Sequence, residues 1–374
     1  MIAIDLAAKP HRPTGLAWWD GRSIQTTTVR SDEEILKAAL EHAIVGIDAP
    51  LSEPAEGSLR ACDRMLRQAR VRFFPVTLPS MRALGKRGQR LADEIRASGI
   101  KVYEIYPGAS LDFLGLPRKQ VSAVANFLSV FGPRPRNIHE SDAAIGVFSL
   151  MLLKAGHGRL LKGEDGAIVV SPPAIPIGEV VTGEFVRRLN RFVVEVRIKG
   201  RTTTAYLRNT GDLSDVLSPG TRLLLNPHNG KHPYLLRATE NTWIDSFEDN
   251  RMAALFLRQR GVIAKSGRRY GNHIFDLETP AGPVEVKGAS YGNAFPLFPR
   301  PCSARAVRQI AAGRLKELIF IAHQPAVAVG LNPACADLAE VLSAATRRGL
   351  EIRAYSTVVW RGFWIGEMEV PFLW

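Results

Sequence analysis

The chain has 374 residues, 46% hydrophobic and 23% charged, which is the composition of a folded protein and excludes general disorder. Because one core rarely extends beyond about 250 residues, the length predicts two or three domains. Lysine and arginine total 49 against 36 acids, and the net charge of +13 favours a polyanionic partner such as nucleic acid, with a membrane surface as the alternative.

The cysteines and the apolar runs limit the location. Cys62, Cys302 and Cys335 lack CxxC spacing, which predicts neither a disulfide framework nor a zinc knuckle and favours a reducing compartment. An acid at position 5 argues against a signal peptide. No apolar run approaches the ~20 residues of a membrane span. We therefore expect a cytoplasmic protein without a membrane segment.

The first fifty residues predict three consecutive strands, a helix and a fourth strand. We expect the strands at residues 2–4, 15–19, 23–29 and 44–47. Ser31 and Glu34 have capping-box spacing, so a helix begins there and runs to about His42. In this βββαβ order the first and fourth strands should lie side by side.

The rest of the first domain alternates helices with one more strand. We expect a basic helical stretch at 59–71, a proline-rich segment at 73–81, a strand at 101–106 and an apolar helix at 141–154. Glycines and Pro172-Pro173 then loosen the chain, and we place a domain boundary near residue 174.

Four carboxylates lie on these elements: Asp5 and Asp48 end two apolar strands, Glu104 lies on a third strand, and Asp142 stands at the start of the last helix. Together they could bind two Mg²⁺ or Mn²⁺ ions about 4 Å apart, which activate water and stabilise the leaving oxygen of a phosphodiester. The arrangement predicts an RNase H-like mixed sheet with a nuclease site. The alternative is that each acid only ends a strand or caps a helix.

Several segments of this part resemble one family. They are MIAIDLA, IDAPLS at 47–52, FFPVTLPSM at 73–81, VYEIYP at 102–107 and HESDA at 139–143. Residues 1–170 resemble the domain of unknown function 429 family, which is itself predicted to contain RNase H-like nucleases. The resemblance implies the same four acids. Sugar kinases and actin-like ATPases also open with a strand ending in Asp, but the chain lacks their later Asp-x-Gly-Gly loops.

A basic stretch follows the second aspartate. Between residues 60 and 90, Asp63 is the one acid among many arginines and lysines. Arg60, Arg64 and Arg67 have i, i+4, i+7 spacing and so share a helix face that could follow phosphates. The alternative is a solvated face that only aids solubility.

Residues 178–240 contain short strands between turns, which predicts a small OB-type barrel. On it, Arg187, Arg191 and Phe192 could bind phosphates and stack on bases of a single strand. The alternative is a barrel edge that charge protects from aggregation.

A hairpin is expected at 273–277 and 284–287. Strand alternation puts Glu285 and Lys287 on one face of VEVK, and Asp276 can reach them from the neighbouring strand. Two acids that hold a metal and a lysine that orients water are the chemistry of PD-(D/E)xK nucleases. The alternative is an exposed ion pair.

The segment from Gly183 onward resembles sugar fermentation stimulation protein A (SfsA). The resemblance rests on RRLNRFVVEV at 187–196, LSPGTRLLL at 217–225, Asn250-Arg251, Asp276 and VEVKG at 284–288. It implies an OB-like barrel, a PD-(D/E)xK-like domain and DNA binding. The chain departs from the family by lacking a glutamate after Asn-Arg and by carrying Arg300, Ala304 and Gln309 at usually polar positions. These losses predict weak metal binding there.

The sequence thus predicts a multidomain α/β protein: an RNase H-like domain at 1–174, an OB-like barrel at 175–240 and a PD-(D/E)xK nuclease-like domain at 241–374. The predicted function is that of a metal-dependent nuclease, or a nuclease-derived nucleic-acid-binding protein, with Mg²⁺ or Mn²⁺ in the first domain. DNA is favoured over RNA. The alternative is a non-enzymatic DNA-binding or regulatory protein of SfsA type with degenerate nuclease sites.

Overall fold

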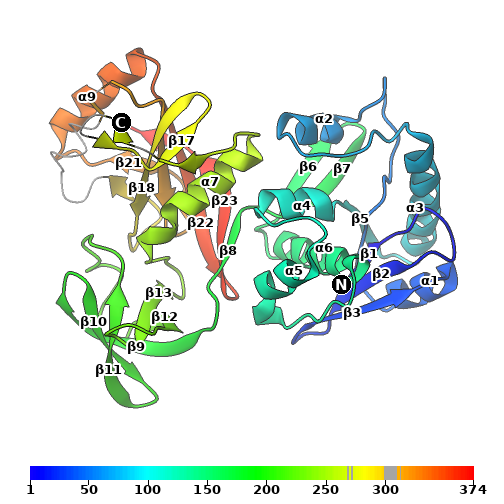
Figure 1. The fold of residues 1–374 in the computed structure, drawn as a ribbon, viewed down its shortest axis with the longest axis horizontal. Coiled ribbons are helices and arrows are strands. Elements are labelled where there is room, and N and C mark those ends of the chain that lie inside the picture. The colour runs from blue at the N-terminus through cyan, green and yellow to red at the C-terminus, as the bar shows by residue number, and fades with distance from the viewer. Residues whose placement is uncertain (268, 271–272, 299–309, 312) are drawn as a thin grey trace. The chain divides into compact units, whose positions relative to one another are not determined.

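The computed structural model describes the chain except residues 268, 271–272, 299–309 and 312. It divides into two compact units (Figure 1). Unit 1 comprises residues 1–172 with 259–261, and unit 2 comprises 173–258 with 262–374. The departures from SfsA at Arg300, Ala304 and Gln309 lie outside the described residues.

Unit 1 is built on a seven-stranded mixed sheet in the order β3-β2-β1-β4-β5-β7-β6. The strands are β1 (Ile2–Asp5), β2 (Thr14–Trp19), β3 (Ile24–Val29), β4 (Ile44–Ile47), β5 (Lys101–Ile105), β6 (Arg159–Gly163) and β7 (Gly166–Val170). β1 is antiparallel to β2 and parallel to β4, so the predicted neighbourhood of the first and fourth strands is confirmed. β4, β5 and β7 continue the parallel part of the sheet.

Helices cover both faces of this sheet. They are α1 (Asp32–Leu40), α2 (Ala61–Gln68), α3 (Pro79–Ala97), α4 (Pro107–Phe113), α5 (Val121–Phe127) and α6 (Ile138–Lys154), with a 3₁₀ turn at Ser129–Phe131. Ile2 and Ile4 pack with α1 and α3 in one core. Ala3 points to the opposite face, where it lies next to Gly146 of α6. Strand alternation therefore puts Asp5 on the α6 face.

The ends of two helices follow from their capping residues. Ser31 and Glu34 form the predicted capping box at the start of α1. α6 begins three residues earlier than expected, because the Asn137 side chain accepts a hydrogen bond from the Glu140 amide and caps the helix.

The predicted barrel is present in unit 2 as a closed five-stranded barrel in the order β10-β11-β13-β12-β9. Its strands are β9 (Val181–Asn190), β10 (Val193–Ile198), β11 (Arg201–Leu207), β12 (Arg222–Pro227) and β13 (Tyr234–Thr239). Inward-facing Val194, Val196, Leu223 and Leu225 are buried in its core. Alternation of apolar and polar residues along each strand closes this small core.

The rest of unit 2 is a second seven-stranded sheet in the order β14-β17-β18-β20-β22-β23-β8. Its strands are β8 (Ala174–Pro176), β14 (Lys265–Ser266), β17 (Leu277–Thr279), β18 (Gly282–Ala289), β20 (Glu317–Ala322), β22 (Glu351–Trp360) and β23 (Phe363–Val370). The other elements are α7 (Asp249–Gln259), α9 (Ala336–Arg347), a 3₁₀ turn at Ser246–Glu248, and the short strands β15 (Arg269–Tyr270), β16 (His273–Ile274), β19 (Leu297–Phe298), β21 (Val329–Leu331) and β24 (Phe372–Leu373).

β8 corrects the expected start of the barrel. Residues 174–176 pair with β23, and Ala174 and Ile175 are buried in the second sheet rather than in the barrel. The barrel itself begins at Val181. The apolar side chain of Ile175 in β8 packs in the core of the second sheet. The residue pattern alone does not distinguish such a strand from a strand of the barrel.

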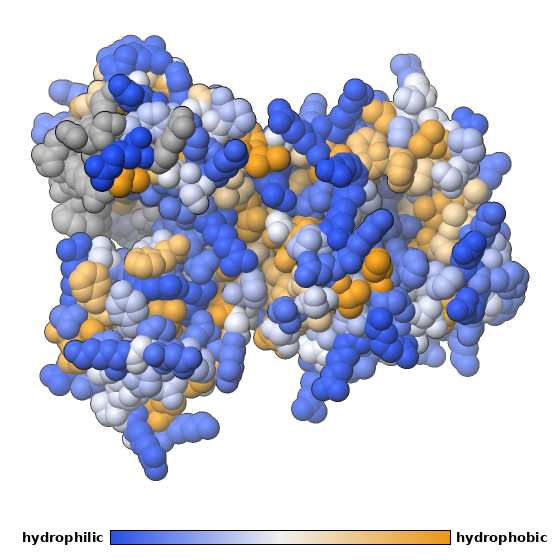
Figure 2. Space-filling model, viewed as in Figure 1, coloured by the Kyte–Doolittle hydropathy of each residue, from blue (hydrophilic) through white to orange (hydrophobic). Residues whose placement is uncertain are grey.

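Hydrophilic side chains cover most of the face shown in Figure 2, with smaller apolar areas between them. None of the helices in the described part of the chain has the length and hydropathy for a bilayer crossing. Cys62 is buried and free, whereas Cys335 is disulfide-bonded, a bond that the cysteine spacing had not predicted.

Candidate metal and nucleic-acid sites

Asp5, Asp48 and Asp142 come together in unit 1. Asp48 shares a hydrogen bond with Asp5, and both aspartates interact electrostatically with Asp142. Burial and then the Asp5 and Asp142 charges raise the pKa of Asp48 well above its usual value. Burial and Asp5 likewise raise the pKa of Asp142 to about 7. Three of the four predicted acids, Asp5, Asp48 and Asp142, therefore form a group of closely spaced carboxyl groups, here called the acid cluster.

His139 stands at the rim of the acid cluster. Its Nδ1 lies 2.6 Å from Asp5 Oδ2, and its side chain is 46% exposed. The hydrogen bond with Asp5 raises the pKa of His139. The structure adds His139 to the site as the hydrogen-bonded neighbour of Asp5.

Gly15 allows α6 to reach the acid cluster. It pairs with Asp5 across β1 and β2, and a Cβ at Gly15 would lie 2.1 Å from the His139 carbonyl oxygen. No other residue type fits so close a backbone contact. The start of α6, which carries His139 and Asp142, therefore approaches Asp5 because position 15 is glycine.

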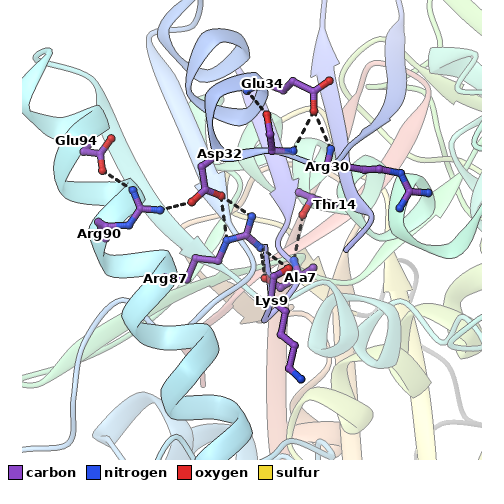
Figure 3. A network of polar contacts seen from close by, with 10 residues as sticks. Ala7, Lys9, Thr14, Arg30, Asp32, Glu34, Arg87, Arg90 and Glu94 are labelled. Atoms are coloured by element: carbon purple, nitrogen blue, oxygen red, sulfur yellow. Dashed lines mark hydrogen bonds and ion pairs between the residues drawn. The ribbon is translucent and has the colours of Figure 1, made fainter. Parts of the chain in front are cut away.

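Arg87 of α3 fixes the segment that follows Asp5 (Figure 3). Its guanidinium donates to the carbonyl oxygens of Ala7 and Lys9 and forms an ion pair with Asp32. Arg90 binds the other Asp32 oxygen. Two cations of the basic stretch thus serve the fold, and a partly buried network of this kind holds the loop in one conformation.

Glu104 is close enough to Asp48 for its charge to add to the raised pKa of Asp48, after the larger effects of burial, Asp5 and Asp142, but its own carboxylate is bound by Arg60. Glu104 pairs with Ile47 across β4 and β5, so its side chain lies on the face opposite Asp5. There both carboxylate oxygens accept hydrogen bonds from Arg60 at 2.7 Å, and the Leu51 amide donates another at 2.8 Å.

The predicted role of Arg60 is corrected, because it is not available to nucleic acid. Its side chain is buried between Glu104 and Asp63, and its residue exposure is 1%. Arg64 and Arg67 are exposed as predicted, on the outer side of α2. The helical spacing of the three arginines was right, but its first member lies at the N-cap and turns inward.

The acid cluster is suited to a divalent cation, although it is not a finished metal site. Among the described residues, no group of three or more His, Cys, Asp or Glu side chains is arranged to hold a metal ion. Yet carboxylate oxygens are the ligands of Mg²⁺ and Mn²⁺. Burial first and the neighbouring carboxylates second raise the pKa values of Asp48 and Asp142, and a cation among them would offset both effects.

A second group of polar residues lies in unit 2, where Asp276, Glu285 and Lys287 meet as predicted. Asp276 Oδ2 accepts from the Val286 amide at 2.8 Å, and Lys287 forms an ion pair with Glu285. Burial raises the pKa of Glu285 against the opposing effect of Lys287, and a hydrogen bond with Asp276 raises it further. This group is here called the hairpin site.

The hairpin site opens into a cavity of about 650 Å³ within unit 2. Asp276 and Lys287 line it from the sheet, and Asn209 and Asp212 line it from the segment that follows β11. Polar side chains from the barrel half and the sheet half therefore face one space, which is large enough for part of a polymeric substrate.

Three residues of this region were missed at the sequence level. His323 Nε2 lies 2.8 Å from Asp249 Oδ1, and His323 Nδ1 lies 2.7 Å from Ser290 Oγ. Asp249 and Ser290 line the same cavity. Asp249 precedes the quoted Asn250-Arg251 pair, but the position of His323, 74 residues later, gave no signal. The histidine fixes the Asp249 carboxylate at the cavity wall.

Some arginines of the barrel surface are bound to other protein groups, and others are exposed to solvent. Arg187 is paired with Glu195 at 2.9 Å, whereas Arg191 lies over the Phe192 ring at 5.7 Å from its centroid. Arg188 donates to the carbonyl oxygens of Gly211 and Asn209 and so fixes the loop beside the cavity. Phe192 is 45% exposed. The predicted pair Arg191 and Phe192 is therefore accessible.

Comparison with known proteins supports the resemblance in unit 2. Residues 186–246 match the SfsA N-terminal OB domain. A sugar fermentation stimulation protein homolog of Pyrobaculum arsenaticum is 36% identical over 34% of this chain and 62% of its own length, and the one of Ruminiclostridium cellulolyticum is 26% identical over 48% and 92%. The solved structure of Pyrococcus furiosus SfsA in complex with Ca²⁺ is 26% identical and covers 53% of this chain and 97% of its own, with a TM-score of 0.48.

The matched residues agree with the local structure. The OB match covers the strands of the closed barrel, from within β9 to the turn after β13. Over about half of its length this chain is thus similar to the sugar fermentation stimulation proteins, and its barrel carries the OB domain found at their N-terminal end.

Proposed function

We propose that this protein is a metal-dependent nuclease whose active site is the acid cluster of unit 1, on an RNase H-like sheet. The observation that carries the proposal is the convergence of Asp5, Asp48 and Asp142. Burial and the charges of the neighbouring aspartates raise the pKa values of Asp48 and Asp142. Such pKa shifts are typical of functional sites. The resemblance of residues 1–170 to the domain of unknown function 429 family supports the same reading.

The three aspartates would hold Mg²⁺ or Mn²⁺. When bound, such an ion lowers the pKa of water and neutralises charge on the phosphodiester. His139, exposed and hydrogen-bonded to Asp5, would hold a proton near the leaving oxygen. Arg64 and Arg67 would bind phosphates at the outer face of α2. Glu104 and Arg60 would position α2 rather than contact the substrate.

Unit 2 would bind nucleic acid, with DNA favoured, and its hairpin site would bind a divalent ion in the manner of PD-(D/E)xK proteins. Asp276 and Glu285 would supply carboxylate oxygens, and Lys287 would orient water or phosphate. Arg191 and Phe192 on the barrel would contact a single strand. A cytoplasmic location belongs to the same proposal.

A cleavage assay tests the activity. Plasmid, single-stranded DNA and RNA are incubated with Mg²⁺ or Mn²⁺ and wild type, Asp5→Asn, Glu285→Gln or the control Asp93→Asn, whose exposed carboxylate contacts only the surface of α3. We expect cleavage by wild type and Asp93→Asn, and a loss of about 100-fold or more in Asp5→Asn. Equal rates in wild type and Asp5→Asn would reject the active site in unit 1.

A non-enzymatic DNA-binding protein of SfsA type is the second candidate, favoured by the OB match. It predicts binding to DNA in the presence of a chelator and no cleavage under any metal condition. Binding by wild type and by Asp5→Asn with equal affinity, together with no product, would select it.

A further inference from the structure

A separate cavity of about 270 Å³ lies in unit 1 beside the acid cluster. Asp48 and the mutually paired Arg60, Asp63 and Glu104 lie at one part of its wall, and apolar side chains form most of the rest. The apolar lining comes from Leu66 of α2, from Phe73, Phe74 and Val76, and from Met81 and Leu84 of α3. The lining includes four of the nine residues of the FFPVTLPSM segment, to which neither metal binding nor phosphate binding gives a role.

The aromatic part of the lining is accessible. Phe74 is 70% exposed although it lines the cavity, and Phe73 is half-buried. Phe74 is continuous with the other apolar side chains of the lining, and an exposed apolar patch of this kind, unlike a single exposed residue, is a usual sign of a binding site. The ring offers a flat surface on which another planar ring can stack.

The cavity wall is held in place by polar contacts that include Tyr106, one of its lining residues. The Tyr106 hydroxyl donates to the Arg72 carbonyl oxygen at 2.6 Å, and Arg118 donates to the same oxygen at 3.0 Å. Arg118 is in turn paired with Asp112 at 2.7 Å. The chain that carries Phe73 and Phe74 is therefore fixed at its start, as a preformed binding site requires.

Basic residues flank the apolar lining residues along the chain. Arg72 directly precedes Phe73, and Arg82 directly follows Met81; both side chains are exposed. Arg64 and Arg67 are exposed on α2, which also contributes Leu66 to the cavity. An apolar, aromatic interior with a basic surround fits a ligand that is planar and apolar at one end and anionic at the other.

We propose that this cavity receives one unstacked nucleobase of the bound strand while the adjoining phosphates lie along the arginines and the acid cluster. The proposal rests on the proposed function and names its substrate class, a strand with an unpaired or easily unpaired base. The volume is below the roughly 300 to 1,000 Å³ of drug-sized pockets, so a single base fits and a stacked base pair does not. A base in an intact duplex must first leave its stack, at a cost of a few kcal/mol.

Fluorescence of 2-aminopurine tests the proposal without any cleavage. Oligonucleotides with 2-aminopurine in a one-base bulge, in a single strand or in a perfect duplex are titrated with the full-length protein in chelator. We expect a change in fluorescence on binding for the bulge and the single strand, and little for the duplex. Phe74→Ala should weaken binding of the bulge about tenfold, the loss of one stacked base at about 1.4 kcal/mol.

Two variants separate the ring from general surface effects. Phe74→Tyr keeps the ring and should bind as wild type does. Val130→Ala removes another exposed apolar side chain of unit 1, outside the cavity lining, and should also bind normally. Binding without a fluorescence change, or equal weakening by Phe74→Ala and Val130→Ala, overturns the proposal.

The result is independent of the nuclease activity. Asp5→Asn should keep the fluorescence response while it loses cleavage. If wild type cleaves but the response to the bulge is missing, the base pocket is wrong and the nuclease stands. If the response is present and no substrate is cleaved, the pocket stands in a binding protein. A pocket that takes free apolar compounds in preference to the oligonucleotide would also contradict the proposal.

Discussion

Arg60 and Glu104 form a buried two-pronged ion pair, with each terminal guanidinium nitrogen 2.7 Å from one carboxylate oxygen. Asp63 closes the other side of the guanidinium at 3.0 Å. Burial raises the pKa of Glu104, although the Arg60 contacts act in the opposite direction. The pair links the start of α2 to β5, so Arg60, predicted to bind phosphates, and Glu104, predicted to bind a metal ion, bind each other instead.

We predict that Arg60→Ala lowers the free energy of unfolding by about 3 to 5 kcal/mol, because it leaves two buried carboxylates without their partner. Glu104→Gln should cost less, since the amide still accepts one hydrogen bond. Chemical denaturation measures both. The control Arg96→Ala breaks an exposed pair with Asp93 and should cost at most about 1 kcal/mol.

The same variants test whether Glu104 acts in catalysis. As a positioning residue it should leave the metal dependence of cleavage in Glu104→Gln unchanged, at a temperature well below unfolding. Loss of cleavage in Glu104→Gln with an unfolding midpoint equal to that of wild type would instead make Glu104 a ligand.

We predict that the stability of the metal-free protein falls as pH rises from about 5 to 8. The folded pKa of Asp142 is about 7, above its unfolded value of 3.8, so its favourable contribution is complete at low pH and is lost as pH rises through 7. His139 acts in the same direction because its folded pKa is also raised. Burial lowers the pKa values of His42 and of the N-terminal amine, so these two groups oppose the trend, whereas Asp32 and Glu140 have lowered pKa values and titrate below this range.

Thermal unfolding in chelator across this pH range measures the effect. Asp142→Asn should flatten the pH dependence relative to wild type, whereas Asp93→Asn should not change it. Excess Mg²⁺ should also flatten it if the ion binds among the aspartates. A slope that is the same in wild type and Asp142→Asn would contradict the assigned pKa.

Gly15→Ala should be strongly destabilising. The new Cβ would meet the His139 carbonyl oxygen at 2.1 Å, so α6 must move away from β2 and take His139 and Asp142 with it. We expect a loss of several kcal/mol in denaturant unfolding, comparable with the more severe overpacking substitutions.

Gly85→Ala is the matched control for Gly15→Ala. Position 85 lies inside α3, and its nearest neighbour to an added Cβ is the Pro50 carbonyl oxygen at 3.4 Å. Alanine there should be neutral or stabilise the helix by up to about 1 kcal/mol. Equal stability of Gly15→Ala and wild type would mean that the start of α6 is not tightly packed on β2.

On the barrel, Phe192→Ala should weaken single-stranded DNA binding by unit 2 by about 1 to 3 kcal/mol, the value of one stacked base. Arg191→Ala should weaken it less and reduce the salt dependence by about one phosphate contact. Anisotropy titrations at several salt concentrations measure both. Leu189→Ala is the control, because Leu189 is 42% exposed near the end of β9, just before the turn that carries Arg191 and Phe192. An equal effect of all three variants would contradict a specific binding surface.

In the Asp5→Asn variant, whose acid cluster is disabled, Mn²⁺ should still stabilise the protein through the hairpin site. Adding Asp276→Asn should abolish this remaining stabilisation. The reason is that Asp276 is the accessible carboxylate next to Glu285 and lines the cavity. Thermal shifts with and without Mn²⁺ measure it, with Asp337→Asn in the first turn of α9 as control. A remaining shift in the double variant would place the ion elsewhere.

Local sequence patterns determined much of this protein. Alternation and strand ends placed Asp5 and Asp48 on adjacent parallel strands, Ser31 and Glu34 fixed the start of α1, and VEVK put Glu285 and Lys287 together. These features depend on neighbours in the chain or on one strand pairing. They can therefore be derived from spacing and from backbone geometry.

Only the tertiary structure decided which side chains meet. Glu104 has the right residue type at a strand end, but its register with Ile47 turns it toward Arg60 and away from Asp5. The contact of His323 with Asp249 likewise joins residues 74 positions apart. Burial and opposite charge select such partners from the whole chain once the sheets and helices pack, and no local spacing encodes that choice.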